Sequence, residues 1–181
     1  MLYAQVHLTL PVWVHDAVDL GRVYATDAEK LRLAIELSQR NVEAESGGPF
    51  GAVVFGPDER IIAIGVNRVL PHACSVAHAE MMAYMLAQGR TQRPRLNRDA
   101  DDLPIGPITL ATSSQPCCQC YGATVWAGID RLLIGARAED AIEQSTHGAQ
   151  ADVASVERSQ RPAEKLSSLG VGHPLRLHPG R

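Results

Sequence analysis

The stretch ITLATSSQPCCQCYGATVWA, residues 108–127, decides the fold. Its apolar start at 108–112 predicts a β-strand. Pro116 occupies the first-turn position that proline favours in a helix, which we expect to run to about Ala127. The apolar run RLLIG at 131–135 predicts another strand. Because a helix then connects two apolar strands, the pattern favours an α/β fold with a sheet covered on both faces.

The sequence before this stretch continues the alternation of helices and strands. Residues 27–45 place apolar side chains at helical spacing, with Thr26 or Asp27 as the N-terminal cap. Two apolar runs joined by PDER predict a β-hairpin. After the hairpin we expect a helix that ends at Gly89, and then a long surface loop. The expected ranges are 52–56 and 61–67 for the strands, 75–88 for the helix and 90–107 for the loop.

Two short motifs place metal-binding side chains at the starts of helices. His78 and Glu80 lie in HAE, and Cys117 and Cys120 lie in PCCQC. One imidazole nitrogen and two thiolates give three ligands for a tetrahedral zinc ion and leave a fourth position open, which is typical of catalytic zinc. The positive ends of the two helices would also favour the thiolates. The motifs therefore predict a zinc site at one edge of the sheet.

Glu80 is two residues from His78, so their side chains diverge around the helix. We expect Glu80 not to bind the metal but to take a proton from water and pass it to a ring nitrogen and a leaving amine. H-x-E followed by P-C-x-x-C is typical of zinc-dependent nucleobase deaminases. Two alternatives stay open: a histidine and cysteines that simply pack in the core, and a closed structural site with Cys74 or His72 as fourth ligand.

Four segments resemble the bacterial guanine deaminases of the cytidine-deaminase-like superfamily. They are GGPFGAVVF at 47–55, GVNRV at 65–69, AHAEMMA at 77–83 and TSSQPCCQCYGATVWAG at 112–128. The resemblance covers about residues 27–138. It implies a three-layer α/β/α sandwich with a mixed sheet of about five strands, one Zn²⁺ per subunit and a homodimer. It also implies hydrolytic deamination of an amino-purine or related amino-heterocycle, most naturally guanine.

The same resemblance implies four substrate-binding residues. Asn67 would hydrogen-bond the purine, Phe50 and Trp126 would line its pocket, and the main chain of Ala79 would touch it. Aromatic walls with a few fixed polar groups suit a flat base. From the residues alone, core packing remains an alternative for the two aromatic residues, and a turn at the end of a strand remains one for Asn67.

Three departures from the family leave the exact substrate open. Gln115 stands where relatives usually carry Glu, and Cys118 and Gln119 replace the usual Pro-Met or Val-Met between the cysteines. Cys118 adjoins a ligand and is expected to point elsewhere and pack. Third, the segment after the last matched strand lacks the second carboxylate and the aromatic residues of the family. Glu143 or His147 could supply the missing second proton shuttle.

The length of 181 residues predicts a single domain, 1–181. About 139–181 would form a divergent C-terminal segment over or beside the active site, in which 171–178 could add an edge strand or a tail. A formal net charge of -3 argues against a nucleic-acid surface. No apolar run reaches the roughly 20 residues of a membrane helix, and the N-terminus is a poor signal peptide, so we expect a cytoplasmic protein.

Several functions remain to be separated by experiment. The first hypothesis is the deaminase of a small heterocycle, with a nucleoside, a pterin or an amino-triazine as alternatives to guanine. The second is a tRNA adenosine deaminase, which shares both zinc motifs but is disfavoured by the acidic net charge. The third is a non-catalytic zinc-binding protein, which the change at Gln115 keeps open.

Overall fold

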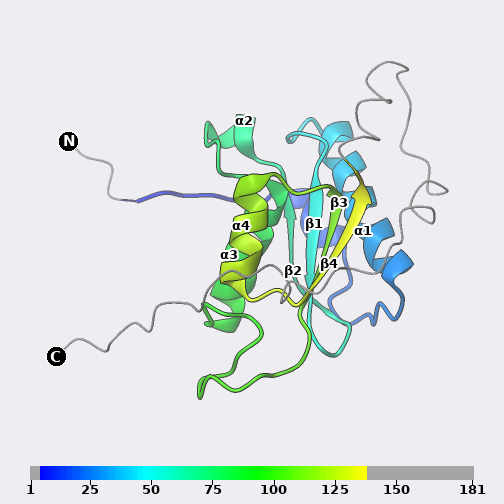
Figure 1. Cartoon of the computed structure of the whole chain (residues 1–181). Helices are drawn as coiled ribbons and strands as arrows, with labels where there is room; N and C mark the ends of the chain where they lie inside the picture. The colour runs from blue at the N-terminus through cyan, green and yellow to red at the C-terminus, as the bar shows by residue number, and fades with distance from the viewer. Residues whose placement is uncertain (1–4, 138–181) are drawn as a thin grey trace.

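The computed structural model of the protein describes residues 5–137, in which helices lie on both faces of a mixed sheet (Figure 1). The strand order is β2-β1-β3-β4. β1 pairs antiparallel with both β2 and β3, and β3 pairs parallel with β4. The strands are β1 (Gly51–Phe55), β2 (Ile61–Val66), β3 (Thr109–Ser114) and β4 (Arg131–Ala136).

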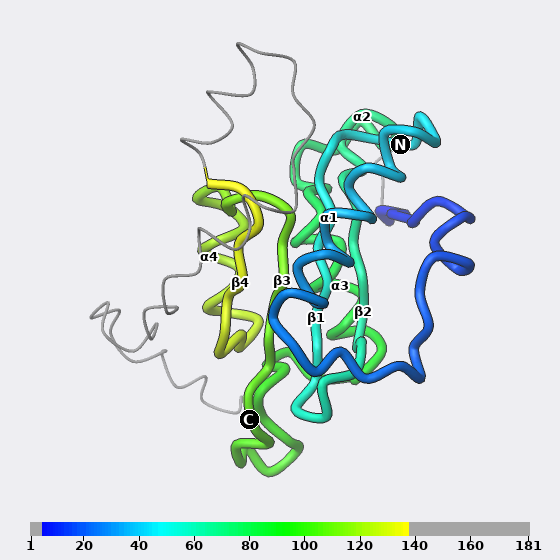
Figure 2. The backbone as a smooth tube through the Cα atoms, turned by 90° about the vertical axis from the view of Figure 1, so that its right-hand side faces the viewer, coloured from blue at the N-terminus to red at the C-terminus, as the bar shows by residue number. Residues whose placement is uncertain are grey.

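The helices make the outer layers. α1 packs on one face of the sheet, and α3 and α4 lie side by side on the other (Figures 1 and 2). This arrangement confirms the three-layer α/β/α sandwich. The helices are η1 (Val12–Asp16), α1 (Asp27–Glu43), α2 (Val69–His72), α3 (Ala79–Thr91) and α4 (Cys118–Ala127). Residues 5–137 contain four strands, and the expected fifth, at 171–178, lies outside the described residues.

The sheet has a hydrophobic core on each face because side chains alternate along β1. Val53 and Phe55 point toward α1, whereas Ala52 and Val54 belong to the core under α3. All five residues of β1 are buried. A strand buried on both faces explains why its sequence is a continuous apolar run.

Local signals set the start of α1. The Thr26 hydroxyl accepts a hydrogen bond from the Glu29 backbone N–H at 3.2 Å, and the Glu29 carboxylate accepts one from the Thr26 backbone at 3.1 Å. This reciprocal pair is a capping box. The hydrogen bonds from Thr26 lower the pKa of Glu29. The prediction that Thr26 could cap this helix is confirmed.

The predicted bounds of α3 were wrong at both ends. The helix begins at Ala79 rather than at 75, because the Ala77 carbonyl accepts a hydrogen bond from the Arg68 backbone N–H at 2.8 Å. It also passes through Gly89 and ends at Thr91. A glycine inside a helix costs only about 1 kcal/mol, which the packing of α3 against the sheet overrides.

Two smaller differences concern the other helices. α4 begins at Cys118, with Cys117 as its N-cap, so Pro116 precedes the helix instead of forming its first turn. The short elements η1 and α2 were not predicted.

Within residues 5–137, no helix has the length and apolar composition needed to cross a membrane.

Candidate active site

The ends of two helices carry the predicted metal ligands. His78 is the N-cap of α3 and Cys117 the N-cap of α4, while Cys120 lies in the first turn of α4. Neither N-cap side chain makes a capping hydrogen bond to the backbone of its helix. Both side chains are therefore free to turn toward a shared point between the two helix starts.

The three ligand atoms form a triangle whose sides match tetrahedral zinc. The His78 Nδ1 atom lies 3.5 Å from the Sγ atoms of both Cys117 and Cys120, and the two sulfurs are 3.7 Å apart. Zn–N bonds of about 2.0 Å and Zn–S bonds of about 2.3 Å at tetrahedral angles place nitrogen and sulfur about 3.5 Å apart and two sulfurs about 3.8 Å apart. The residues present fit a zinc ion.

A fourth protein ligand is not found among the described residues. The metal-binding group in residues 5–137 comprises His78, Cys117 and Cys120, without Cys74 or His72. The His72 Nε2 atom lies instead 2.9 Å from the Thr9 carbonyl oxygen. Cys118 is exposed, so the expectation that it packs was wrong. A three-ligand site leaves a coordination position open, as in catalytic zinc sites.

Glu80 lies beside the metal ligands without joining them. It is in the first turn of α3 and its side chain is buried. Its Oε2 atom is 3.4 Å from the Cys120 Sγ, and its Oε1 atom accepts a hydrogen bond from the Thr112 hydroxyl at 3.2 Å. A carboxylate oxygen therefore lies beside one of the three ligand atoms, the Cys120 sulfur.

The electrostatics of Cys120 favour a bound cation. Burial raises the pKa of the Cys120 thiol far above its ordinary value, and the Glu80 carboxylate raises it further. A divalent metal reverses both effects, because coordination removes the thiol proton outright.

Contacts that the sequence did not reveal hold α4 against α3. The Tyr84 hydroxyl lies 2.7 Å from the Thr124 Oγ1 atom, and Thr124 in turn donates to the Cys120 carbonyl at 2.9 Å. The Gln119 side-chain amide donates to the Val76 carbonyl at 3.2 Å, in the loop that carries His78. These bonds fix the cysteine ligands relative to the histidine.

Three of the predicted substrate residues lie at one edge of the sheet. Phe50 and Asn67 flank the paired ends of β1 and β2, and the Asn67 N–H donates to the Phe50 carbonyl at 3.0 Å. Gly65, two residues before Asn67, packs directly against the Ala79 carbonyl of α3. Phe50 is 41% exposed, whereas Asn67 is buried. The structure thus brings Phe50, Asn67 and Ala79 together next to His78.

Trp126 is not brought to the same place. It lies six residues after Cys120 on α4, about 9 Å further along the helix axis. Its side chain is 72% exposed. Within one chain Trp126 therefore does not flank the metal ligands. Glu143 and His147 lie outside the described residues, as does the segment at about 139–181.

A buried asparagine organises the loop at this edge. Asn41 of α1 is fully buried, and its amide donates to the carbonyls of Gly48 at 2.8 Å and Asn67 at 3.0 Å. Its Oδ1 atom accepts a hydrogen bond from the Ser46 hydroxyl at 2.8 Å. The sequence did contain a signal for the burial of Asn41. Asn41 follows Ala34 and Ser38 at helical spacing, which places it on the buried side of α1.

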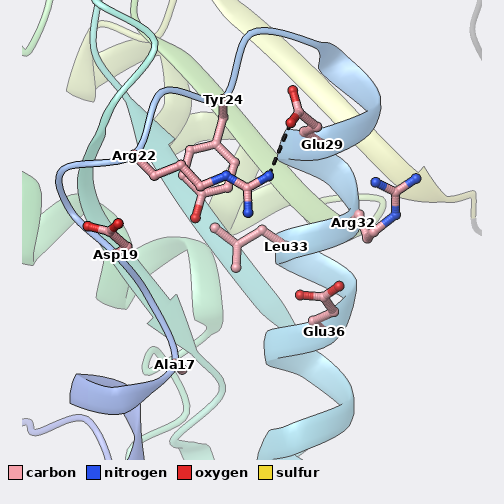
Figure 3. A pocket seen from close by; sticks show the side chains of 8 residues that line it. All are labelled: Ala17, Asp19, Arg22, Tyr24, Glu29, Arg32, Leu33 and Glu36. Atoms are coloured by element: carbon pink, nitrogen blue, oxygen red, sulfur yellow. Dashed lines mark hydrogen bonds and ion pairs between the residues drawn. The ribbon is translucent and has the colours of Figure 1, made fainter.

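A separate pocket of about 270 Å³ lies on the α1 side of the sheet (Figure 3). Its lining residues are Ala17, Asp19, Arg22, Tyr24, Glu29, Arg32, Leu33 and Glu36. The Arg22 guanidinium stacks on the Tyr24 ring at 4.7 Å and pairs with Glu29 at 3.1 Å. None of the candidate site residues lines this pocket, so it is distinct from the metal site.

The fold and the His-Cys-Cys group define the class of the protein as a zinc-binding, deaminase-like α/β/α domain. Comparison with known proteins makes the class specific. Residues 25–136, more than half of the chain, match the family model of the cytidine and deoxycytidylate deaminase zinc-binding region. The chain belongs to this family.

Curated relatives carry names with different substrates. The chain is 33% identical over 117 residues to a probable cytosine deaminase of Schizosaccharomyces pombe and 37% identical over 113 residues to a guanine deaminase of Bacillus subtilis. It is 32% identical over 110 residues to a tRNA-specific adenosine deaminase of Haemophilus influenzae. The matches cover 65%, 62% and 61% of this chain and 64%, 66% and 58% of the relatives. The matched region thus spans less than two thirds of the length of each relative.

Solved structures agree with the resemblance to guanine deaminases. The structure of guanine deaminase from Nitrosomonas europaea is 33% identical, with a TM-score of 0.69, and covers 87% of this chain and 86% of that chain. A solved relative in complex with 8-azaguanine is 37% identical, with a TM-score of 0.69, over 79% of this chain and 76% of that chain. The predicted fold class and family resemblance are confirmed.

Proposed function

We propose that this protein is a zinc-dependent hydrolytic deaminase that acts on guanine or a closely related amino-purine and releases ammonia. The observation that carries the proposal is the zinc-sized triangle of His78, Cys117 and Cys120 with the Glu80 carboxylate beside it. The likeness to guanine deaminases, and to a relative with 8-azaguanine bound, supports a purine substrate.

Each residue of the site has a distinct role in the proposed reaction. His78, Cys117 and Cys120 hold one zinc ion. The bound ion supplies Lewis acidity, which lets water act as a nucleophile near neutral pH. Glu80 takes the two protons of that water in turn and delivers one to the ring nitrogen and the other to the departing amine. The bond from the ring carbon to the amine breaks, a bond to the water oxygen forms, and one ammonia leaves for each water consumed.

The edge next to His78 supplies the proposed substrate contacts. The Asn67 Oδ1 atom accepts a hydrogen bond from the Val69 N–H at 3.2 Å, which orients the side-chain amide. The Nδ2 group is then directed to donate to an acceptor on the substrate, such as a ring carbonyl. Phe50 offers a half-exposed ring for stacking, and the main chain of Ala79 completes the set.

We also propose that two copies of the chain associate through α4. Tyr121, Val125 and Trp126 present an exposed apolar face on this helix, at 38%, 43% and 72% exposure. Burial of such a face is the ordinary reason for association. Trp126 could line a substrate pocket only from a second chain. Sedimentation at micromolar concentration should give twice the mass of the chain, and a monomer would contradict this part of the proposal.

The test is ammonia release from a panel of amino-bases, nucleosides, pterins and amino-triazines, with cytosine included. We expect turnover of guanine or another amino-purine. Glu80→Gln should keep one zinc per chain and lose at least about 10²-fold in kcat, the usual contribution of a general acid–base group. Glu43→Gln, at an exposed position near the end of α1, is the matched control and should behave like the wild type.

Other outcomes select the other functions. Zinc-loaded protein that releases no ammonia from any compound would favour a non-catalytic role. Undiminished activity of Glu80→Gln would contradict the proposed mechanism. Tight, salt-sensitive binding and deamination of tRNA would support a tRNA adenosine deaminase, despite the formal net charge of -3.

A further inference from the structure

We infer that Thr112 is a positioning residue that holds the Glu80 carboxylate in register with the metal site. The inference rests on the proposed function, because it gives Glu80 the proton-transfer role. Thr112 does not contact the substrate in this arrangement. The Thr112 hydroxyl acts through Glu80 alone.

The two oxygens of Glu80 have different surroundings. Oε1 accepts a hydrogen bond from the Thr112 hydroxyl at 3.2 Å, on the side of the sheet. Oε2 lies 3.4 Å from the Cys120 sulfur, on the side of the metal ligands. A hydrogen bond to Oε1 limits rotation of the carboxylate, so Thr112 favours the orientation in which Oε2 lies on the side of the metal ligands.

Thr112 is itself held rigidly. It is 1% exposed and lies in the middle of the sheet, paired with Ala52 of β1 and Ile134 of β4. Its single hydroxyl hydrogen also faces the Ser114 carbonyl oxygen at 3.1 Å, so this hydrogen is shared between that carbonyl and Glu80 Oε1. A β-branched side chain is restricted at χ1, and these contacts further limit its rotation.

Glu80 needs such an anchor because its side chain has three rotatable bonds. A glutamate without a fixed partner samples several rotamers, and only some of them direct Oε2 toward the metal ligands. Misplacement of a catalytic group by about 1 Å can cost about 10²-fold in rate. The hydrogen bond from a rigid strand to a flexible carboxylate therefore has a catalytic consequence beyond packing.

Three substitutions separate the hydroxyl from the packing of the side chain. Thr112→Val keeps the branched shape and removes the hydroxyl, whereas Thr112→Ser keeps the hydroxyl and removes a methyl group. Thr109→Val makes the same change at a buried threonine of the same strand, 3% exposed, whose hydroxyl does not bond Glu80. Each variant is loaded with zinc, and its kcat, KM, zinc content and crystal structure are determined with the amino-purine that the wild type deaminates.

We expect Thr112→Val to lower kcat by about 10- to 100-fold with little change in KM and one zinc per chain retained. Thr112→Ser should recover most of the wild-type kcat, and Thr109→Val should match the wild type. In the crystal structure of Thr112→Val, the Glu80 carboxylate should leave its wild-type position or occupy several positions. In Thr112→Ser it should stay in place.

Several results would overturn the inference. One is a Glu80 carboxylate that keeps its wild-type position in Thr112→Val. Another is an equal loss of kcat in Thr112→Val, Thr112→Ser and Thr109→Val, which would indicate packing alone. A wild type that deaminates nothing refutes the proposed function instead, and the crystal structures then still decide whether Thr112 positions Glu80.

Discussion

The contact between β2 and α3 makes Gly65→Ala an incisive test of how the fold places the site. A β-carbon at Gly65 would lie 2.0 Å from the Ala79 carbonyl oxygen and 2.5 Å from the Ala83 nitrogen, whereas ordinary contact begins at 3.4 Å. Both atoms belong to the backbone of α3, so no side-chain rotation relieves the overlap. The substitution therefore forces the start of α3 away from the sheet by about 1 Å or more.

The displacement has a cost in stability and a cost in metal binding. Overpacking of this kind typically destabilises a protein by about 1–3 kcal/mol. For a chain of this size, each kcal/mol lowers the melting temperature by about 2–4 °C. His78 and Glu80 move with the start of α3, away from the cysteine ligands on α4. We expect zinc affinity to fall about tenfold or more, which corresponds to about 1.4 kcal/mol.

The assay compares urea unfolding of the zinc-loaded proteins and competition for zinc with a chelator. Gly89→Ala, in α3 itself, is the matched control. The carbon added at Gly89 would meet nothing within 4 Å. This variant should stabilise the protein by about 0.5–1 kcal/mol and leave zinc affinity unchanged. If Gly65→Ala were as stable as the wild type and bound zinc equally well, the close contact would not be what positions α3.

Two further predictions concern a buried lysine and the bond between the two ligand-bearing segments. Lys30 is 1% exposed and pairs with Glu59, so Lys30→Ala should lower the free energy of unfolding in urea by about 3 kcal/mol or more. Lys30→Met fills the volume of the lysine side chain and should lower it clearly less. Equal losses of stability in the two variants would contradict a role for that volume. Gln119→Met removes the hydrogen bond to the Val76 carbonyl and should speed zinc transfer to a chelator by about 2- to 10-fold, whereas an unchanged rate would show that this bond does not hold the site together.

The order of the elements could be predicted from the sequence because the signals are local. The cap at Thr26, the apolar runs of the strands and the helical spacing in α1 each depend on residues a few positions apart. The ligand types were equally readable. The HxE and PCxxC motifs contain an imidazole and thiols, at His78 and Cys117, and these groups can bind zinc in any fold that brings them together.

Element boundaries were predicted less well, because tertiary contacts compete with local preference. The Arg68 backbone N–H donates a hydrogen bond to the Ala77 carbonyl, so α3 begins only at Ala79. Packing against the sheet keeps the helix intact through Gly89. Local propensities differ by only about 1 kcal/mol, and one hydrogen bond or buried contact outweighs them. Trp126 shows a related limit: its distance along the helix from Cys120 follows from its sequence spacing, whereas its 72% exposure does not.

The sequence by itself determined which groups could bind zinc and move protons, since those properties belong to the side chains. Only the tertiary structure decided which of them meet. The antiparallel neighbours β2, β1 and β3 bring Asn67 beside Phe50 and place Thr112 under Glu80, thirty-two residues away along the chain. Contacts over such separations depend on strand order and on the distance between helix and sheet, and no local pattern encodes either.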